Sequence, residues 1–251
     1  MTKMIMHGCN GRMGHVIVDL VKEDSDIEVV AGVDAFGESN YDFPVFKSLL
    51  DCNVEADVIV DFSNASAVDG LLDYCADKKL PVVLCSTGLS DEQLAKVKDT
   101  SSKVAVLKSA NMSVGINTLF KVLKEISPLL ADAGFDIEIV EKHHNQKLDA
   151  PSGTALALAD AINEGFDTKY DYTYDRSQRR EKRRQNEIGI SAVRGGTIVG
   201  DHDVIFAGHD EVITLSHRAY SRAVFGKGAI EAAKFLSGKA AGLYDMGNVI
   251  N

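Results

Sequence analysis

The chain has 251 residues, 45% of them hydrophobic and 25% charged, and its formal net charge is −10 at pH 7. A chain of this length can bury one large hydrophobic core or two smaller ones. The acidic balance argues against nucleic acid as a partner, because phosphate backbones attract basic surfaces. A small anionic substrate is compatible with it, since such a ligand needs only a local basic pocket.

The beginning of the chain and its cysteines bear on the compartment. The apolar residues Met4–Met6 are followed at once by His7 and Gly8, a run too short for a signal peptide. No run approaches the roughly 20 apolar residues that span a bilayer. The four cysteines form neither a C-x-x-C pair nor a zinc-ligand spacing with histidine. We therefore expect a cytoplasmic protein with reduced thiols, no membrane association and no metal site.

Residues 1–112 alternate short apolar runs with amphipathic helical patterns. Ser90 with Gln93 predicts a capping box at the start of one of these helices. Alternation of this kind requires parallel strand pairing with crossover helices, so the segment predicts a doubly wound, Rossmann-type α/β domain. The predicted buried strands, rich in Val, Ile and Leu, are Lys3–His7, Glu28–Val33, Asp57–Phe62, Pro81–Cys85 and Val104–Leu107.

The pattern changes after Asn111. Long alternating segments with few helices between them predict a second, α+β domain built on an open mixed sheet. We place this domain at residues 113–219 and expect the last segment, from about residue 220 to 251, to pack back on the first domain. The expected elements are a helix at Val114–Leu130, strands at Phe135–Glu141, Ile188–Val193, Thr197–Phe206 and Glu211–His217, and a helix at Ala223–Leu236.

A glycine-rich loop with the pattern G-x-x-G-x-x-G joins the first predicted strand to the first helix. Such a loop presents backbone N–H groups and a helix N-terminus to a pyrophosphate. Asp34 ends the second strand, where an acid is placed to accept hydrogen bonds from an adenosine ribose. The alternative to a cofactor site is that the glycines only form a tight turn and that Asp34 is a solvated residue at a strand end. The expected cofactor-binding residues here are Gly8, Cys9, Asn10, Gly11, Arg12, Met13 and Asp34.

Two later loops lie at the carboxyl ends of the fourth and fifth predicted strands. Polar, glycine-containing loops at this edge of the sheet would line the nicotinamide end of a dinucleotide cleft. Each loop could equally be an ordinary helix-capping segment. The residues expected to contact the cofactor are Cys85, Ser86, Thr87, Ser109, Ala110, Asn111 and Met112.

The segment from Glu141 to Ala155 holds the strongest candidate for chemistry. We expect Pro151 to suit a helix start and the following amides to point outward unpaired, as an anion-binding end. Lysine and histidine would add positive charge and transferable protons, which suits a carboxylate-bearing substrate that gains a proton and a hydride. A metal site fits poorly, because adjacent strand histidines point to opposite faces; a surface turn before a capped helix is the other alternative. The candidates are His143, His144, Lys147, Ser152, Gly153 and Thr154.

This segment, with the pattern H-H-x-x-K-x-D-A-P-S-G-T-A, resembles the 4-hydroxy-tetrahydrodipicolinate (dihydrodipicolinate) reductases of lysine and diaminopimelate biosynthesis. The glycine loop and the segment from Arg194 to His202 resemble the same family, in the same order. The resemblance implies hydride transfer from NADH or NADPH to C4 of a cyclic dicarboxylate and a homotetramer formed through the second-domain sheet. It implies His143 as the active-site histidine, Lys147 as the proton donor, and carboxylate binding by His144, Lys147, Gly153 and Thr154.

The chain departs most from the family at Arg176–Arg184, where six basic residues stand with one acid. Such a run could bind nucleic acid or a phosphorylated ligand, but the overall acidity favours a solvated, mobile loop. Two rival functions are considered. Another amino-acid-pathway dehydrogenase is one, although a semialdehyde enzyme needs a second-domain cysteine and all four cysteines precede that domain. A dinucleotide-sensing regulator is the other, although no helix-turn-helix pattern supports it.

Cofactor preference follows from the charge around Asp34. A carboxylate there accepts a ribose 2′-hydroxyl but repels a 2′-phosphate. Ala35 follows it, no basic residue occurs until Lys47, and Glu38 and Asp42 add negative charge. Arg12 is the one residue of the loop that could reach a 2′-phosphate. We predict that NADH is preferred and that NADPH is also accepted.

Overall fold

The computed structural model describes residues 1–36 and 41–250, so Glu38 lies outside the described residues. The chain divides into two compact units. The first comprises Met1–Val114 and Arg222–Asn251, and the second comprises Gly115–Ser221. Each unit has its own hydrophobic core. Among the helices of the described residues, none is long and apolar enough to cross a membrane.

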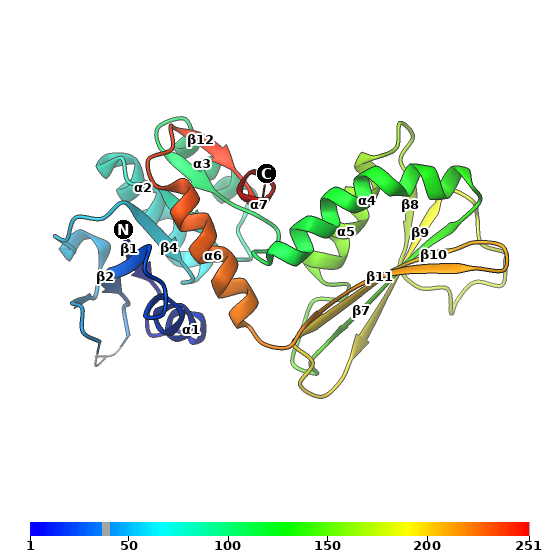
Figure 1. Ribbon diagram of the computed structural model, residues 1–251, viewed down its shortest axis with the longest axis horizontal. Helices are drawn as coiled ribbons and strands as arrows, with labels where there is room; N and C mark the ends of the chain where they lie inside the picture. The colour runs from blue at the N-terminus through cyan, green and yellow to red at the C-terminus, as the bar shows by residue number, and fades with distance from the viewer. Residues whose placement is uncertain (37–40, 251) are drawn as a thin grey trace. The chain divides into compact units, whose positions relative to one another are not determined.

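Within the described residues, the first unit contains a seven-stranded sheet with the order β12-β6-β5-β4-β1-β2-β3, and every pairing in it is parallel (Figure 1). This confirms the predicted Rossmann-type sheet. The strands are β1 (Thr2–His7), β2 (Ile27–Val33), β3 (Val45–Phe46), β4 (Val58–Asp61), β5 (Val82–Leu84), β6 (Ala105–Leu107) and β12 (Gly242–Tyr244). The helices are α1 (Arg12–Val21), η1 (Leu49–Asp51), η2 (Ala65–Ala67), α2 (Val68–Lys78), α3 (Asp91–Ser101), α6 (Ala223–Leu236) and α7 (Met246–Val249).

Apolar side chains on both faces of the sheet explain why its strands are continuous hydrophobic runs. Met4 and Met6 of β1 pack in the cluster that contains α1 and α6, whereas Ile5 packs in the cluster that contains α2 and α3. The predicted capping box is present, because Ser90 and Gln93 each bond the other's backbone N–H at the start of α3. The sheet is therefore covered on both sides, with the carboxyl ends of its strands at one edge.

The sequence did not predict β3 and β12, which are too short to show a period. β3 pairs with β2 so that Phe46 lies opposite Val33, and the amide of Asp34 donates to the Phe46 carbonyl at 2.9 Å. Lys47, which follows β3, therefore lies beside the end of β2. Lys47 is 13 residues from Asp34 in the sequence, so the sequence alone did not indicate that the two lie close together.

The second unit contains a mixed sheet with the order β11-β10-β7-β9-β8, in which β7 pairs parallel to β9 and antiparallel to β10. The predicted open mixed sheet is confirmed. The strands are β7 (Asp136–His143), β8 (Asp171–Thr173), β9 (Glu187–Arg194), β10 (Gly200–Ala207) and β11 (Val212–Ala219). The helices are α4 (Val114–Asp132) and α5 (Gly153–Glu164), which lie on the same face of this sheet (Figure 1).

Alternation along the central strands sets the core of the second unit. The burial of β7 and β10 alternates residue by residue, and inward side chains such as Ile139 and Phe206 pack against Leu123 of α4 and Leu158 of α5. β10 begins at Gly200 rather than at the predicted Thr197, because the preceding residues turn through Gly196, whose φ is +49°. The glycine makes that left-handed conformation accessible.

The prediction that Arg176–Arg184 is a solvated, mobile loop is wrong for two of its arginines. Arg176 donates to both carboxylate oxygens of Glu138, at 2.8 and 2.7 Å, and to Glu187 at 2.6 Å. Arg183 donates to Glu138 at 3.1 Å and to Asp136 at 2.8 Å. The acidic side chains that alternation places on β7 thus hold these two arginines, while the other four basic residues of the run are exposed.

Candidate active site

The glycine loop of the first unit leaves the start of α1 accessible to an anion. Gly11 is the N-cap and supplies no side-chain cap. Gly8 has φ +83°, and a Cβ there would lie 2.8 Å from the Phe62 carbonyl oxygen. A Cβ at Gly14 would lie 2.3 Å from the Cys9 carbonyl oxygen. Only glycine fits these two positions, so the backbone amides of the loop can approach a phosphate group closely.

Asp34 connects this loop to the end of β2. Its carboxylate oxygens accept from the amides of Asn10 and Phe36, at 2.9 Å each. Because each carboxylate oxygen has two lone pairs, the half-buried side chain retains capacity to accept from ribose hydroxyls. A cavity of about 440 Å³ is bordered by Asp34 and the glycine loop. Its lining includes backbone amides of the loop and the carboxylate of Asp34, which are the groups expected to face a dinucleotide.

The same cavity is lined by Phe62, Ser63 and Asn64, which the sequence analysis missed. These residues follow β4, the neighbour of β1 in the sheet. The loops after β5 and β6 were assigned to the cofactor site from the sequence. The same reasoning applied to β4 would have found this loop as well. In parallel sheets all carboxyl-end loops of adjacent strands meet at one edge.

Several predicted cofactor residues have buried side chains. Cys9 is fully buried, and burial, with the charge of Asp34, raises the pKa of its thiol to about 11. The Ser86 hydroxyl donates to Asp61 at 2.6 Å, and Met112 packs in the core with α6. Cys85 is half-buried, and desolvation raises the pKa of its thiol far above its usual value. Cys9, Ser86 and Met112 can therefore offer a cofactor mainly their backbone. Ser109 and Asn111 are half-buried, and Thr87 and Ala110 are exposed.

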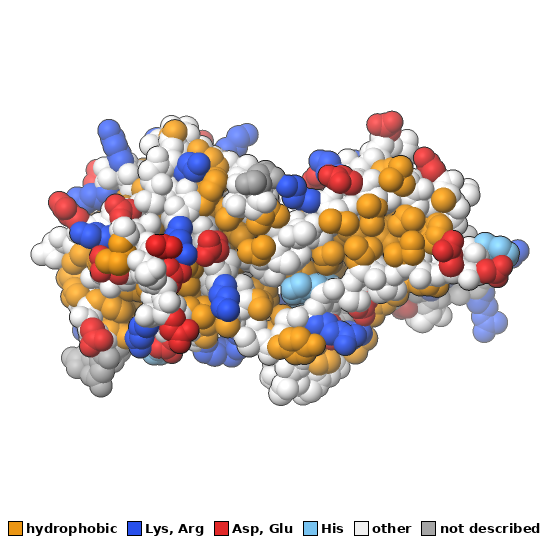
Figure 2. Space-filling view, in the orientation of Figure 1, with side chains coloured by type: hydrophobic (Ala, Val, Ile, Leu, Met, Phe, Trp, Pro, Cys, Tyr) orange, Lys and Arg blue, Asp and Glu red, His pale blue; other side chains and the backbone are white. Residues whose placement is uncertain are grey.

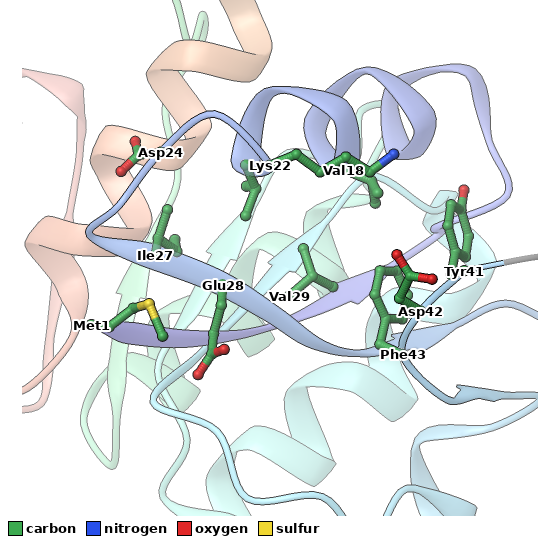
Figure 3. Close-up of a pocket in the computed structure, with 11 residues that line it drawn as sticks. Met1, Val18, Lys22, Asp24, Ile27, Glu28, Val29, Tyr41, Asp42 and Phe43 are labelled. Atoms are coloured by element: carbon green, nitrogen blue, oxygen red, sulfur yellow. The ribbon is translucent and has the colours of Figure 1, made fainter.

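A second hollow in this unit, of about 300 Å³, lies between α1 and β2 (Figure 3). Val18 from the helix and Ile27 and Val29 from the strand supply apolar lining, and Tyr41 stands at its rim with its hydroxyl donating to the Cys9 carbonyl at 2.8 Å. As far as the described residues go, its lining includes none of the predicted site residues. We therefore do not assign it to the candidate site.

In the second unit, the carboxylate of Glu141 holds the candidate cluster together. Glu141 is fully buried, and its Oε2 lies 2.6 Å from Nδ1 of His143. Arg194 donates to both of its oxygens at 2.7 Å, and the Ser152 amide donates to Oε1 at 2.9 Å. Burial raises the pKa of Glu141, but the hydrogen bonds from Arg194 and His143 outweigh it, so the pKa lies below its usual value. One ionised carboxylate thus links β7, β9 and the start of α5.

The predicted helix start needs a correction. α5 begins at Gly153, with Ser152 as N-cap, so Pro151 precedes the cap instead of opening the helix. The Ser152 amide is not unpaired, because it donates to Glu141, and its hydroxyl accepts from the Ala155 amide at 3.2 Å. The buried Ser152 therefore positions the helix start. Gly153, exposed, and Thr154, half-buried, form the first turn.

The two candidate proton carriers have different environments. His143 is 8% exposed, and burial lowers the pKa of its ring despite the hydrogen bond to Glu141; the charges of Lys147 and Arg194 lower it further. Lys147 is paired with Asp149 at 2.8 Å, and its side chain is 22% exposed. The lowered pKa favours the neutral ring of His143 at neutral pH, and Lys147 lies on the loop that follows it. A Cβ at Gly200 would lie 3.1 Å from Nε2 of His143, so glycine keeps that side of the ring open.

Near Glu141, Nδ1 of His144, Nε of Arg194 and Nδ1 of His202 are buried and have no hydrogen-bond partner among residues 1–36 and 41–250. His202 is 3% exposed, lies edge-on to His143 with 5.2 Å between ring centroids, and bonds the Ser152 hydroxyl through Nε2 at 3.2 Å. Burial, with the charge of His143, lowers the pKa of His202 to about 4. The strand register places His202 opposite Glu141 and Arg194 opposite His143, which no sequence spacing reveals.

A parallel sheet with a glycine loop before α1 and an acid after β2 defines a Rossmann-type oxidoreductase fold, with a nicotinamide cofactor implied. The family model for the N-terminus of dihydrodipicolinate reductase matches residues 2–112 of this chain. The family model for the C-terminus of dihydrodipicolinate reductase matches residues 115–250. The chain belongs to the dihydrodipicolinate reductase family. This confirms the resemblance.

Relatives named 4-hydroxy-tetrahydrodipicolinate reductase match the whole chain. One from Caldanaerobacter subterraneus subsp. tengcongensis is 54% identical, covering 100% of this chain and 98% of the relative. One from Clostridium tetani is 52% identical with the same coverage. A solved structure of dipicolinate-bound dihydrodipicolinate reductase from Paenisporosarcina sp. TG-14 is 27% identical, has a TM-score of 0.78, and covers 99% of both chains.

The environment of His202 predicts how stability depends on pH. With a folded pKa of about 4 and an ordinary value of 6.5, the unfolded chain binds more protons between these values. The free energy of unfolding should therefore fall as the pH drops through this window, by up to about 1.4 kcal/mol per pH unit from this group. Urea unfolding at several pH values in this window gives the free energy of unfolding as a function of pH. The slope of that free energy against pH should be shallower for His202→Gln than for the wild type.

His209 provides the control for this measurement, because its side chain is 98% exposed. His209→Gln should retain the wild-type slope. An unchanged slope in His202→Gln would contradict the assignment of a low pKa to this residue.

Proposed function

We propose that the chain reduces 4-hydroxy-tetrahydrodipicolinate to tetrahydrodipicolinate in diaminopimelate and lysine biosynthesis. The reduced cofactor, when bound, supplies a hydride for C4, and water is lost when the hydroxylated form is the starting species. The observation that carries the proposal is the cluster around Glu141, which joins His143 to a helix start, with Lys147 on the loop between them and paired with Asp149. The names of the full-length relatives support the same reaction. The four cysteines are free thiols, and we propose a cytoplasmic location.

The second-unit residues divide the work of binding and proton transfer. Lys147 is the proton donor, because burial lowers the pKa of His143 and favours its neutral ring, which leaves Lys147, paired with Asp149, as the neighbouring N–H donor. His143, oriented through Nδ1 by Glu141, presents its other nitrogen toward the open side left by Gly200. The substrate carboxylates are held by His144, Lys147, Gly153 and Thr154. Ser152 contributes by holding the helix start rather than by direct contact.

Lys147→Ala should reduce kcat by on the order of 10²-fold or more, the usual scale for a lost general acid. Steady-state kinetics with the cyclic dicarboxylate generated in situ measure this, with cofactor oxidation in its absence as the blank. His143→Ala should also lower kcat, whereas His144→Ala should act mainly by raising KM. Near-normal turnover by correctly folded Lys147→Ala, or the reverse pattern in the two histidine variants, would overturn these roles.

In the first unit, the residues present fit a nicotinamide dinucleotide. The loop from Gly8 to Met13 would hold the pyrophosphate, and Asp34 would accept from the adenosine ribose. The loops Cys85–Thr87 and Ser109–Met112 would contact the nicotinamide half. The cavity beside Asp34 and the two glycines that exclude a Cβ support this placement.

We propose that NADH is preferred over NADPH. Asp34 repels a 2′-phosphate. Two cations moderate the effect: Arg12 of the loop, which is exposed, and Lys47, which lines a cavity together with Ala35. A preference of about 10-fold corresponds to about 1.4 kcal/mol, which one unfavourable charge contact can supply.

An Asp34→Ser, Ala35→Arg double variant should shift kcat/KM toward NADPH, because it removes the repelling carboxylate and adds a cation. Lys47→Ala should shift the ratio the other way. The measurement is kcat/KM for each cofactor at fixed salt concentration. A wild-type preference for NADPH would show that Asp34 does not select the cofactor, and Arg12 and Lys47 would then be the residues to test.

The sheet of the second unit supports assembly into a homotetramer. Within the described residues, β11 is an edge strand with β10 as its one strand neighbour, and Val212 and Ile213 are 61% and 39% exposed. Figure 2 shows further hydrophobic side chains gathered over the second unit. An exposed apolar edge strand invites pairing with another chain unless it is covered.

Light scattering at micromolar concentration should give a mass near four times the 27.1 kDa of the chain. Ile213→Lys should reduce this mass, because it places a charge on the apolar edge of β11. Lys239→Ala, a substitution in the first unit, serves as the control. A wild-type monomer would contradict the proposal.

A further inference from the structure

His7, the last residue of β1, is held in one orientation by Asp61. The two residues lie opposite each other in the pairing of β1 with β4, and Nδ1 of His7 lies 2.8 Å from Oδ1 of Asp61. Asp61 is fully buried and also accepts from the hydroxyls of Ser63 and Ser86, at 2.6 Å each. Burial raises the pKa of this carboxyl, but the hydrogen bond and charge of His7 and the two serines outweigh it, and the pKa lies below its usual value. An ionised carboxylate only accepts, so Nδ1 carries the hydrogen of this bond.

The other ring nitrogen, Nε2, has no hydrogen-bond partner among residues 1–36 and 41–250, although His7 is only 9% exposed. His7 lines both the cavity of about 440 Å³ beside Asp34 and a neighbouring cavity of about 660 Å³. Val33 and Ala35 are shared by the two cavities, and Leu49 and Leu71 make the second one largely apolar. Its place at the junction of two cavities leaves Nε2 accessible to a ligand that occupies either of them.

Structural stability alone does not account for this arrangement. Replacing a buried ion pair by apolar residues is often neutral or stabilising. Ile5, on the same face of β1, packs in an apolar cluster that an aliphatic residue at position 7 would extend. The chain instead places a histidine, a buried carboxylate and two serines at the edge of the sheet where the glycine loop begins.

We propose that Nε2 of His7 hydrogen-bonds the adenosine half of the nicotinamide dinucleotide, in the cavity that it shares with Asp34. The proposal rests on the proposed function, since it requires the dinucleotide in this cavity. Nδ1 donates to Asp61, so Nε2 is the ring nitrogen left to bond a ligand. Ribose hydroxyls and the amino group of adenine are the hydrogen-bonding groups that this half of the cofactor offers. In the second cavity, Leu49 and Leu71 offer apolar surface to the adenine ring.

Two substitutions of His7 test the roles of its two ring nitrogens separately. In His7→Asn the amide nitrogen takes the place of Nδ1, so the bond to Asp61 is kept and Nε2 is lost. In His7→Gln the amide takes the place of Nε2, so the bond to Asp61 is lost instead. Titration of NADH fluorescence should give a Kd raised about 5- to 10-fold in His7→Asn, and a smaller rise in His7→Gln. A merely structural histidine would give the opposite order, which would overturn the proposal.

Fragments of the cofactor locate the contact. AMP should bind His7→Asn more weakly than it binds the wild type, whereas reduced nicotinamide mononucleotide should bind both equally. A loss of affinity for the mononucleotide alone would overturn the proposal. The reduced hypoxanthine analogue of NADH, which lacks the adenine amino group, distinguishes that group from the ribose hydroxyls. If its affinity still falls in His7→Asn, the ribose is the partner; if wild type and variant bind it equally, the amino group is.

Failure of this inference is distinguishable from failure of the proposed function. If the chain did not use a nicotinamide dinucleotide, wild-type protein would not bind NADH in this titration. If only the inference is wrong, the wild type binds NADH and His7→Asn matches it. Thermal unfolding of both variants verifies that they are folded.

Discussion

The buried carboxylate of Glu141 is the interaction on which the second unit depends most. It is fully buried, and four donors from His143, Arg194 and Ser152 surround it. An isolated charge in this position would be strongly unfavourable, so the site is stable only when all of these partners are in place. The bonds that make Glu141 tolerable also fix the orientation of His143 and the beginning of α5, so the fold and the proposed chemistry depend on the same contacts.

The first unit uses a related device at the carboxyl edge of its parallel sheet. Asp61 ends β4 and is satisfied by His7, Ser63 and Ser86, while Asp34 follows β2 and accepts from the backbone amide of Asn10 in the glycine loop. Each carboxylate gathers groups from segments far apart in the sequence. Because the strands are parallel, the loops that these acids join all lie at the edge where a dinucleotide binds.

Much of this architecture could be predicted from local patterns. Apolar runs separated by helical spacing predicted the parallel sheet, and clean alternation predicted the mixed sheet. The glycine loop and the segment from Glu141 to Ala155 identified the two candidate regions. These signals are visible because each arises within about a dozen adjacent residues.

The remaining features depend on pairing between distant segments. Lys47 lies beside the end of β2 only because the two-residue strand β3 pairs there. Glu141 stands in an alternating strand like any acidic residue, and its role becomes visible only with Arg194 and Ser152 in place. Arg176 looked solvated for the same reason, since its partner Glu138 is far away in sequence. Strand register and burial by remote residues leave no periodic trace in the chain.

The double attachment of Glu141 has a consequence for the loop of residues 144–151. His143 before this loop and Ser152 after it bond the same carboxylate, so the loop is closed at its base. A segment closed in this way loses most of its conformational freedom when the chain folds, before any substrate arrives. Less ordering entropy is then lost on binding, and Lys147 searches a small volume. The flexibility of a lysine side chain is thereby combined with the fixed position of a short, pinned backbone.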